Sequence, residues 1–531
     1  MSTSDTDTDV LVVGAGPTGL TLACDLARRG VSCRVVERGQ SGFPGSRGAG
    51  IQPRSREIFE DLGVLGAIQE AGGPFPYTKV WDGDKVVDTV DVTTRNDPRP
   101  DRPFGEIWML TQWRTVEILR ARFEELGGRI ESDAELIGLS QDADQVTATV
   151  RRADGTSELV RSRYLVAADG SRSIARESLG VPFERVALPA PEMLIGDIVV
   201  ENLDYTYWHI WPTAEGGLVT LCPIKGGDTF AFVVQFTAPG TSPDVERDGE
   251  LEGLQELLSS RTGFDIKISN VRFVSILYPR AAMVDRFRVG RVFLAGDAAH
   301  VHAPTGGQGL NTSVQDAYNL GWKLGAVLRH GAPDALLDSY QAERHQVAAD
   351  LLQRSTGILD RDQKDAEVGF TKRGEDTHQL DLAYPASPLT AERRGSLAEG
   401  ALRAGERAPD APCTDASGAS VRLFDLFRGT CFTLLAFGDV AAPSVPEADD
   451  VLRTYHVRSP QAAPDPAAII DFEGHARKAY ADKGFFLIRP DGYCALATHD
   501  ANDVSTYLAQ HLGLTTEQRA NETGELIRGA S

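Results

Sequence analysis

Three glycines near the start of the chain have the spacing of a phosphate-binding turn. Gly14, Gly16 and Gly19 follow an apolar stretch that predicts a strand over 10–13, and they lead into a predicted helix over 20–29. In such a fingerprint the first glycine permits a tight turn, and the second lets a pyrophosphate approach the backbone. The third lets the helix pack closely on the strand. The pattern indicates a dinucleotide site at a helix N-terminus.

Acidic residues follow three further stretches that predict strands. The second predicted strand ends at Glu37, where a carboxylate could accept both ribose hydroxyls of an adenosine. The segment YLVAADGSRS at 164–173 places an AspGly pair at a strand end. AspGly often makes an ordinary turn, but beside a dinucleotide site the carboxylate could fix backbone amides around the pyrophosphate. The segment LAGDAAHVHAPTGGQGLN at 294–311 places a GlyAsp pair after another strand and before a glycine-rich loop.

Composition excludes several classes of protein. The 531 residues include 54 Lys and Arg against 76 Asp and Glu, and the net charge is −22. This balance argues against a nucleic-acid partner, because no excess of basic side chains exists to displace phosphate counterions. The six cysteines show no CxxC pair or zinc spacing, so we expect a reducing compartment and no metal site. The polar N-terminus and the absence of long apolar runs predict a cytoplasmic protein without a membrane partner.

The chain length and the order of predicted strands and helices indicate an α/β protein of several domains. A doubly wound, Rossmann-like domain is expected to be discontinuous, with a small excursion near 76–108 into a β-sheet-rich domain. The predicted domains occupy 1–185 with 280–400, then 186–279, and finally 405–531. In the last domain we predict strands over 432–437 and 486–493.

The motifs together resemble those of a known enzyme family. The glycine fingerprint, AspGly, GlyAsp and the segment QDAYNLGWKL at 315–324 occur in the order found in class A, single-component FAD-dependent aromatic hydroxylases. This is the fold family of para-hydroxybenzoate hydroxylase and phenol hydroxylase, and the resemblance covers most of residues 9–350. It implies a Rossmann-like FAD-binding domain and a β-sheet-rich substrate-binding domain.

The last domain resembles the thioredoxin-like extension of phenol hydroxylases and bacterial aromatic polyketide hydroxylases. The segment GDVAA at 438–442 stands where a thioredoxin carries its CxxC motif. We therefore expect a structural or homodimer-contact role for this domain, and no disulfide exchange.

Roles for individual residues follow from the resemblance by matched position. Glu37 would bind the adenosine ribose, and Asp297 would hold the ribityl chain. Arg47 and Gln112 would contact the phosphate and ribityl region. The other implied cofactor contacts are Gly14, Gly16, Pro17, Thr18, Gly19, Arg38, Asp169, Gly170, Gly296, Gly309, Leu310 and Asn311.

The glycine-rich loop would face the flavin ring. Pro304, Gly306 and Gly307 are the implied loop residues, and the positive helix end behind them can stabilise negative charge on the flavin. The resemblance implies a flavoprotein monooxygenase that uses O2, with NADPH or NADH as a transient co-substrate, through a flavin C4a-hydroperoxide. Its expected substrate is a phenolic or polycyclic aromatic, polyketide-type compound, as in antibiotic biosynthesis.

Other reactions remain open on the same fold. Baeyer–Villiger oxygenation or epoxidation of a polyketide would use nearly the same residues. A flavin halogenase is disfavoured, because WHIWP at 208–212 matches the halogenase signature WxWxIP only in part. A flavin reductase-dehydrogenase and a non-catalytic flavin-binding scaffold are further alternatives.

Aromatic strands in the 186–279 region would supply the wall for a flat substrate. The candidate substrate-binding residues are Tyr207, His209, Trp211 and Cys222. Alternate residues of a strand face opposite ways, so about half of such candidates should be packing residues. His209 could deprotonate a phenol, but a histidine satisfied within the core is favoured. His300 and His302 are interpreted as loop anchors beside GlyAsp rather than as metal ligands.

Overall fold

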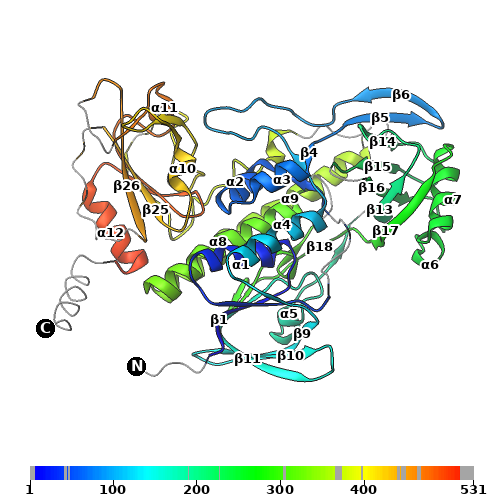
Figure 1. Cartoon of the computed structure of the whole chain (residues 1–531), viewed down its shortest axis with the longest axis horizontal. Coiled ribbons are helices and arrows are strands. Elements are labelled where there is room, and N and C mark those ends of the chain that lie inside the picture. The colour runs from blue at the N-terminus through cyan, green and yellow to red at the C-terminus, as the bar shows by residue number, and fades with distance from the viewer. Residues whose placement is uncertain are drawn as a thin grey trace.

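The computed structural model describes residues 6–514 except 41–44, 46–47, 189, 226–227, 303–306, 365–373, 396, 398, 439, 441–442, 444–449 and 463–467. Figure 1 shows a central α/β body flanked on one side by a second sheet and on the other by a C-terminal α/β part. This is the predicted fold class. In the described residues, no helix has both the length and the apolar character needed to cross a membrane.

An eight-stranded sheet forms the middle of the central body, in the order β19-β20-β11-β1-β2-β8, with β10 and β9 continuing from β11. Neighbouring strands from β20 to β8 are parallel. The strands are β1 (Thr8–Val13), β2 (Cys33–Val36), β8 (Ile130–Glu131), β9 (Ala134–Gln141), β10 (Val146–Arg152), β11 (Ser157–Ala167), β19 (Arg288–Val289) and β20 (Val292–Leu294). Parallel strands buried on both faces read as near-continuous apolar runs, and β1 has that pattern.

Helices pack around this sheet, and two three-stranded sheets join them. The helices are α1 (Pro17–Arg28), α2 (Pro53–Asp61), α3 (Leu65–Ala71), α4 (Gln112–Glu125), α5 (Ile174–Ser178), α8 (Gly309–His330) and α9 (Asp338–Lys364). The small sheets are β3 (Gly50–Ile51), β7 (Trp108–Met109) and β4 (Gly73–Pro74), and β12 (Val186–Ala187), β18 (Arg280–Met283) and β21 (His300–Val301). Helix α1 begins earlier than predicted because Pro17 occupies its first position, where the missing N–H costs nothing.

The second large sheet has seven strands in the order β17-β13-β16-β15-β14-β5-β6. Its strands are β5 (Tyr77–Asp82), β6 (Lys85–Val90), β13 (Glu192–Val200), β14 (Tyr207–Trp211), β15 (Val219–Pro223), β16 (Thr229–Phe236) and β17 (Ile268–Leu277). Helices α6 (Val245–Asp248) and α7 (Leu251–Thr262) accompany it, and one apolar cluster joins α7 to one face of the sheet. The excursion near 76–108 thus supplies two strands, with β5 parallel to β14.

The C-terminal part holds an eight-stranded mixed sheet in the order β22-β29-β28-β25-β26-β27-β23-β24. Its strands are β22 (Ala391–Glu392), β23 (Pro412–Thr414), β24 (Ser420–Arg422), β25 (Phe432–Phe437), β26 (Leu452–Arg458), β27 (Ala468–Ile470), β28 (Gly484–Ile488) and β29 (Cys494–Thr498). Its helices are α10 (Leu423–Phe427), α11 (His475–Ala479) and α12 (Ala501–Leu512).

One predicted strand in this part is wrong in its second half. The strand expected over 486–493 ends at Ile488, and the chain then turns, with the Gly492 N–H donating to the Arg489 carbonyl at 2.9 Å. Pro490 has no N–H for a sheet, and Gly492 has a φ of +80° that suits a turn. The strand predicted over 432–437 matches β25 and is confirmed.

Candidate functional site

The sequence motifs meet at one edge of the central sheet. Strands β2, β1, β11 and β20 lie side by side and parallel, so their carboxyl ends share that edge. Gly14 follows β1, Glu37 follows β2, Asp169 lies two residues beyond β11, and Gly296 lies two residues beyond β20. In open α/β sheets ligands bind outside the carboxyl ends of the strands.

The three fingerprint glycines occupy three different environments. Gly14 has a φ of +103°, and a Cβ built there would lie 2.4 Å from the Ala168 carbonyl oxygen. A Cβ at Gly19 would lie 1.9 Å from the Gly14 carbonyl oxygen, so this glycine permits α1 to pack on the turn. Gly16 has no atom within 4 Å of its built Cβ and caps the N-terminus of α1. A phosphate group fits this open position beside free backbone N–H groups.

Glu37 holds the fingerprint turn in place. Its Oε2 accepts a hydrogen bond from the Ala15 N–H at 2.9 Å, and its Oε1 accepts one from the Gly39 N–H at 3.0 Å. A carboxylate offers about four lone-pair sites, which leaves acceptor capacity for ribose hydroxyls. The next residue, Arg38, is exposed.

Asp169 has an acceptor that the protein leaves unused. Its Oδ2 accepts from the Ala175 N–H at 3.3 Å, but its buried Oδ1 has no hydrogen-bond partner among the described residues. Burial raises the pKa of this carboxyl group. Gly170 turns the chain with a φ of +79°. A buried oxygen without a donor fits a ligand hydroxyl or a bound water.

The GlyAsp turn packs directly against the fingerprint helix. Gly296 has a φ of +59°, and a Cβ built there would lie 2.7 Å from Thr18 Oγ1 and 3.0 Å from Ser313 Oγ. The turn is therefore closed by α1 on one side and by α8 on the other. Asp297 lies in the short 3-10 helix Gly296–Ala298, and its side chain is exposed at the sheet edge.

Asp316 anchors this turn, and the sequence analysis assigned it no role. Its buried Oδ2 accepts from the Gly296 N–H at 3.1 Å and lies 2.7 Å from His300 Nε2, while its Oδ1 accepts from Arg344 Nε at 2.7 Å. These contacts place His300 as a loop anchor. In the described part of the chain, no cluster of His, Cys, Asp and Glu side chains is arranged to hold a metal ion. The signal available from sequence was the position of Asp316 within QDAYNLGWKL.

The side chain of Asn311, near the start of α8, has a structural role. Its Oδ1 accepts from the Gln52 N–H at 2.8 Å, and its Nδ2 donates to the carbonyls of Gly50 at 2.8 Å and Gly307 at 2.7 Å. The side chain thus ties two loops together, and its backbone is the part that remains for a cofactor. Gly307 turns with a φ of +65°.

The remaining predicted residues lie around the same helix starts or outside the described residues. Pro17 and Thr18 form the first turn of α1, while Gly309 and Leu310 begin α8 and Gln112 begins α4. Arg47, Pro304 and Gly306 lie outside the described residues.

The predicted substrate residues on β14 point away from this edge. Trp81 Nε1 donates to His209 Nδ1 at 3.0 Å, and His209 Nε2 bonds to the Asp204 carbonyl at 2.8 Å, so both ring nitrogens are used. Burial lowers the pKa of His209. The Trp211 ring stacks on Trp81 at a centroid distance of 5.4 Å, in the cluster beneath α7. His209 and Trp211 thus pack on each other and on the α7 side of the sheet, with ring centroids 6.2 Å apart.

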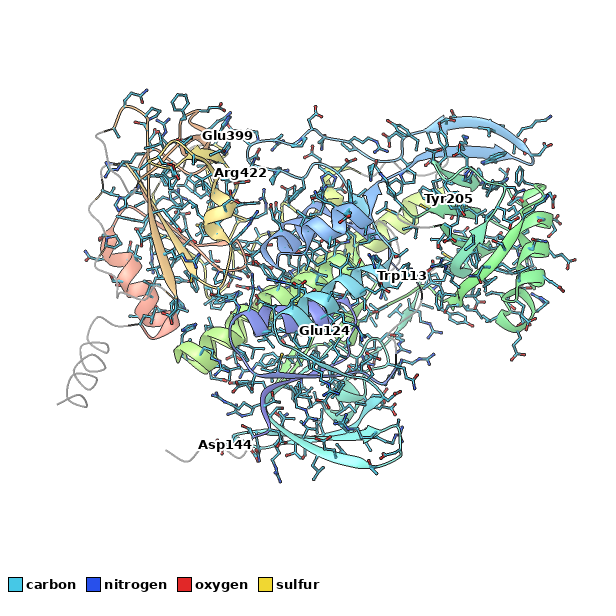
Figure 2. All side chains as sticks on the ribbon, in the orientation of Figure 1. Trp113, Glu124, Asp144, Tyr205, Glu399 and Arg422 are labelled. Atoms are coloured by element: carbon cyan, nitrogen blue, oxygen red, sulfur yellow. The ribbon has the colours of Figure 1, made fainter. Side chains whose placement is uncertain are left out.

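The opposite face of the same strands turns towards the central body. Trp208 and Ile210 lie in one apolar cluster with Ile107 and Met109, and Cys222 packs against it. Further along this face, the Phe273 ring lies against Gly45. A Cβ added to Gly45 would lie 2.3 Å from that ring. Tyr205, labelled in Figure 2, packs instead on Phe230, with ring centroids 4.3 Å apart. Tyr207, whose ring centroid lies 3.9 Å from Lys79 Nζ, is on the same face of β14 as His209 and Trp211. Cys222 is therefore the predicted substrate residue that lies on the inner face.

Comparison with known proteins agrees with this geometry. Residues 7–355 match the model of the FAD binding domain family, and residues 402–518 match the aromatic-ring hydroxylase C-terminal family. A flavin-dependent monooxygenase of Mycobacteroides abscessus is 41% identical over 94% of this chain and 99% of its own length. The 12-dehydrotetracycline 5-monooxygenase/anhydrotetracycline 6-monooxygenase of Streptomyces rimosus is 31% identical over 91% of this chain and 94% of its own.

Solved structures give the same result. The ternary complex of aklavinone-11 hydroxylase with FAD and aklavinone superposes with a TM-score of 0.80 at 29% identity, and covers 96% of this chain and all of its own. The glycine cradle, the unused Asp169 oxygen and the exposed Asp297 carboxylate fit an FAD molecule at the sheet edge. The chain belongs to the family of flavin-dependent aromatic monooxygenases built on this FAD-binding domain.

Proposed function

We propose that the protein is an NAD(P)H-dependent monooxygenase that hydroxylates a phenolic or polycyclic aromatic, polyketide-type compound. The observation that carries the proposal is the apolar inner face of the seven-stranded sheet, which is directed at the central body that bears the cofactor motifs. Relatives named for anhydrotetracycline and for aklavinone support the substrate class.

The chain's own groups would hold FAD along the sheet edge. Gly16 and the α1 N-terminus would receive the pyrophosphate, Glu37 the adenosine ribose, and Asp297 the ribityl chain. Asp169 would accept a hydrogen bond through its unused oxygen. Bound FAD would supply electron transfer from NAD(P)H and the activation of O2. The protein contributes position and the exclusion of water from the reacting groups.

The inner sheet face suits a flat, apolar ligand. Cys222, Val233 and Phe273 are half-buried here, whereas the alternate positions of their strands lie in the core under α7. Aromatic and aliphatic walls with few polar groups are typical of small-molecule sites. An electron-rich ring needs no protein nucleophile for this reaction, so positioning is the main task of the wall.

Nicotinamide nucleotide dependence is supported by an arginine group beside AspGly. Arg172 and Arg185 are near each other, since Arg185 Nη2 donates to the Ser171 carbonyl at 2.5 Å. Arg280 lies on β18, which pairs with the strand after Arg185. None of the three forms an ion pair with a described carboxylate, although the chain has a net charge of −22. Unpaired guanidinium groups favour phosphate ligands.

Anaerobic reduction of the flavin tests the proposal. The purified protein would be mixed with NADPH or NADH, with and without phenols and polycyclic aromatic polyketides, while its flavin absorbance is followed. We expect an aromatic ligand to accelerate reduction, and aerobic turnover to give a product about 16 mass units heavier. Flavin that is reduced without an oxygenated product would indicate a dehydrogenase. Flavin that no nicotinamide nucleotide reduces would indicate a binding scaffold.

A further inference from the structure

A fully buried group of charges joins the C-terminal part to the central body. Lys323 on α8, Glu343 on α9, and Arg489 and Asp491 in the turn after β28 have side chains that are at most 1% exposed. Glu343 accepts from Arg489 Nη1 at 2.6 Å and Nη2 at 2.9 Å, and from Lys323 Nζ at 2.7 Å. Arg489 Nε also donates to Asp491 at 2.8 Å. Two positive and two negative charges balance, so no member can be lost without leaving a buried charge unpaired.

Arg344, the residue after Glu343 on α9, contacts the central body instead of the buried charges. Successive residues of a helix point about 100° apart, so Glu343 and Arg344 contact different surroundings. Arg344 donates from Nε to Asp316 at 2.7 Å, from Nη2 to the Thr312 carbonyl at 3.1 Å, and from Nη1 to Tyr384 Oη at 2.9 Å. Tyr384 in turn packs on Tyr493 of the C-terminal part, with ring centroids 4.5 Å apart.

Asp316 completes the path to the cofactor edge. The carboxylate that accepts from Arg344 also accepts from the Gly296 N–H at 3.1 Å and contacts His300 at 2.7 Å. The turn that presents Asp297 is therefore separated from the C-terminal part by a short series of direct contacts. These run from Arg489 to Glu343, then through the adjacent Arg344 to Asp316.

Other contacts already hold the two parts together. Arg428 pairs with Glu60 at 2.6 Å on the surface, and the Trp322 ring packs edge-on against Phe432 at 5.4 Å. Apolar packing and a surface ion pair thus also join the two parts. A buried, bidentate ion pair adds directional contacts that fix one geometry, because a small shift would break several charged hydrogen bonds at once.

We propose that the C-terminal domain is a positioning domain for the cofactor site. Arg489 and Tyr493 fix α9 and Tyr384, and Glu343 and Arg344 act as positioning residues that hold Asp316 and the Gly296–Asp297 turn in the geometry that receives FAD. This role rests on the proposed function of that turn in holding the ribityl chain.

FAD titration of the apoprotein tests the proposal with matched variants. Glu343→Gln and Arg489→Met break the buried pair, Tyr384→Phe removes only the hydroxyl that accepts from Arg344, and Arg428→Met breaks the surface pair between the same parts. We expect Glu343→Gln and Arg489→Met to raise the FAD dissociation constant about tenfold or more, and Tyr384→Phe to raise it by about threefold. Arg428→Met should leave it unchanged. The absorption spectrum at saturating FAD should shift in the first three variants, and a purely structural role would not move it.

Three outcomes would overturn the proposal, and each identifies a different failure. If the variants have a lower melting temperature but bind FAD with native affinity and spectrum, the buried charges serve only to hold the two parts together. If Asp297→Ala binds FAD normally, the proposed role of the turn fails, and the positioning role fails with it. If Asp297→Ala weakens binding and Tyr384→Phe does not, only the positioning role fails. Tyr384→Phe keeps the test decisive if the charge variants do not fold.

Discussion

Gly296 packs against Thr18 so closely that a Cβ at position 296 would lie 2.7 Å from the threonine hydroxyl oxygen. The contact joins a turn after β20 to the first helix, and no side chain larger than hydrogen fits between them. It fixes the distance between the segment that carries the fingerprint and the segment that carries Asp297.

Replacing Gly296 with alanine should therefore separate the two motifs. We expect Gly296→Ala to lose most of its bound FAD, because the methyl group pushes the turn away from α1. Gly155→Ala is the matched control, since Gly155 has a similar positive φ of +82° with open space around its Cβ position. Both variants should lose about 1 to 2 kcal/mol of stability from left-handed backbone. FAD content per protein, measured by absorbance, should fall only for Gly296→Ala, and equal occupancy in both would contradict the packing role.

The fingerprint glycines should respond differently to the same change. Gly16→Ala places a methyl group in open space, so the apoprotein should keep its melting temperature while its FAD dissociation constant rises about tenfold or more. Gly19→Ala would clash with the Gly14 carbonyl and should destabilise the apoprotein itself. Thermal unfolding of both apoproteins and fluorescence titration with FAD check this. Native FAD affinity in a folded Gly16→Ala protein would show that the pyrophosphate does not approach there.

The proposed cofactor site at the carboxyl ends of the central strands was predictable, because the sequence motifs that mark it are local. A glycine triplet or an acidic residue at a strand end is visible in ten residues, and parallel strands bring such ends together wherever they lie in the chain. The boundaries of α1 and β28 were less accurate. In each case a proline decided the outcome, by starting the helix at Pro17 and by ending the strand before Pro490.

The inner and outer faces of the substrate sheet were not predictable in the same way. Alternation along β14 separates Trp208 from His209 and Trp211, but it does not say which set meets the central body and which meets α7. The buried charges were missed for a related reason. Glu343, Arg344 and Arg489 look like ordinary surface residues in sequence, and only the docking of distant segments buries them.

His209 should contribute to the pH dependence of the free energy of unfolding, and it should not affect the pH dependence of turnover. Burial lowers its pKa below the ordinary value of about 6.5, so the unfolded chain binds a proton in a range where the folded chain does not. Its contribution to stability is therefore present above about pH 6.5 and is lost as the pH falls. His209→Gln should lose less stability than the parent between about pH 6.5 and 5 in denaturant titrations. The pH profile of turnover should be the same in both proteins, and a lost ionisation would restore His209 as a general base.

Enlarging a side chain on each face of β15 tests which face meets the substrate. Cys222 is half-buried on the inner face, so Cys222→Phe should narrow the site and weaken binding of a polycyclic ligand about tenfold while FAD content stays constant. Leu221 is fully buried on the opposite face, and Leu221→Phe should cost about 1 to 3 kcal/mol of stability through overpacking, with ligand affinity unchanged. Ligand titrations followed by flavin absorbance, with unfolding curves for both variants, measure the two effects. If Leu221→Phe alone weakened ligand binding, the substrate would lie on the α7 side of the sheet.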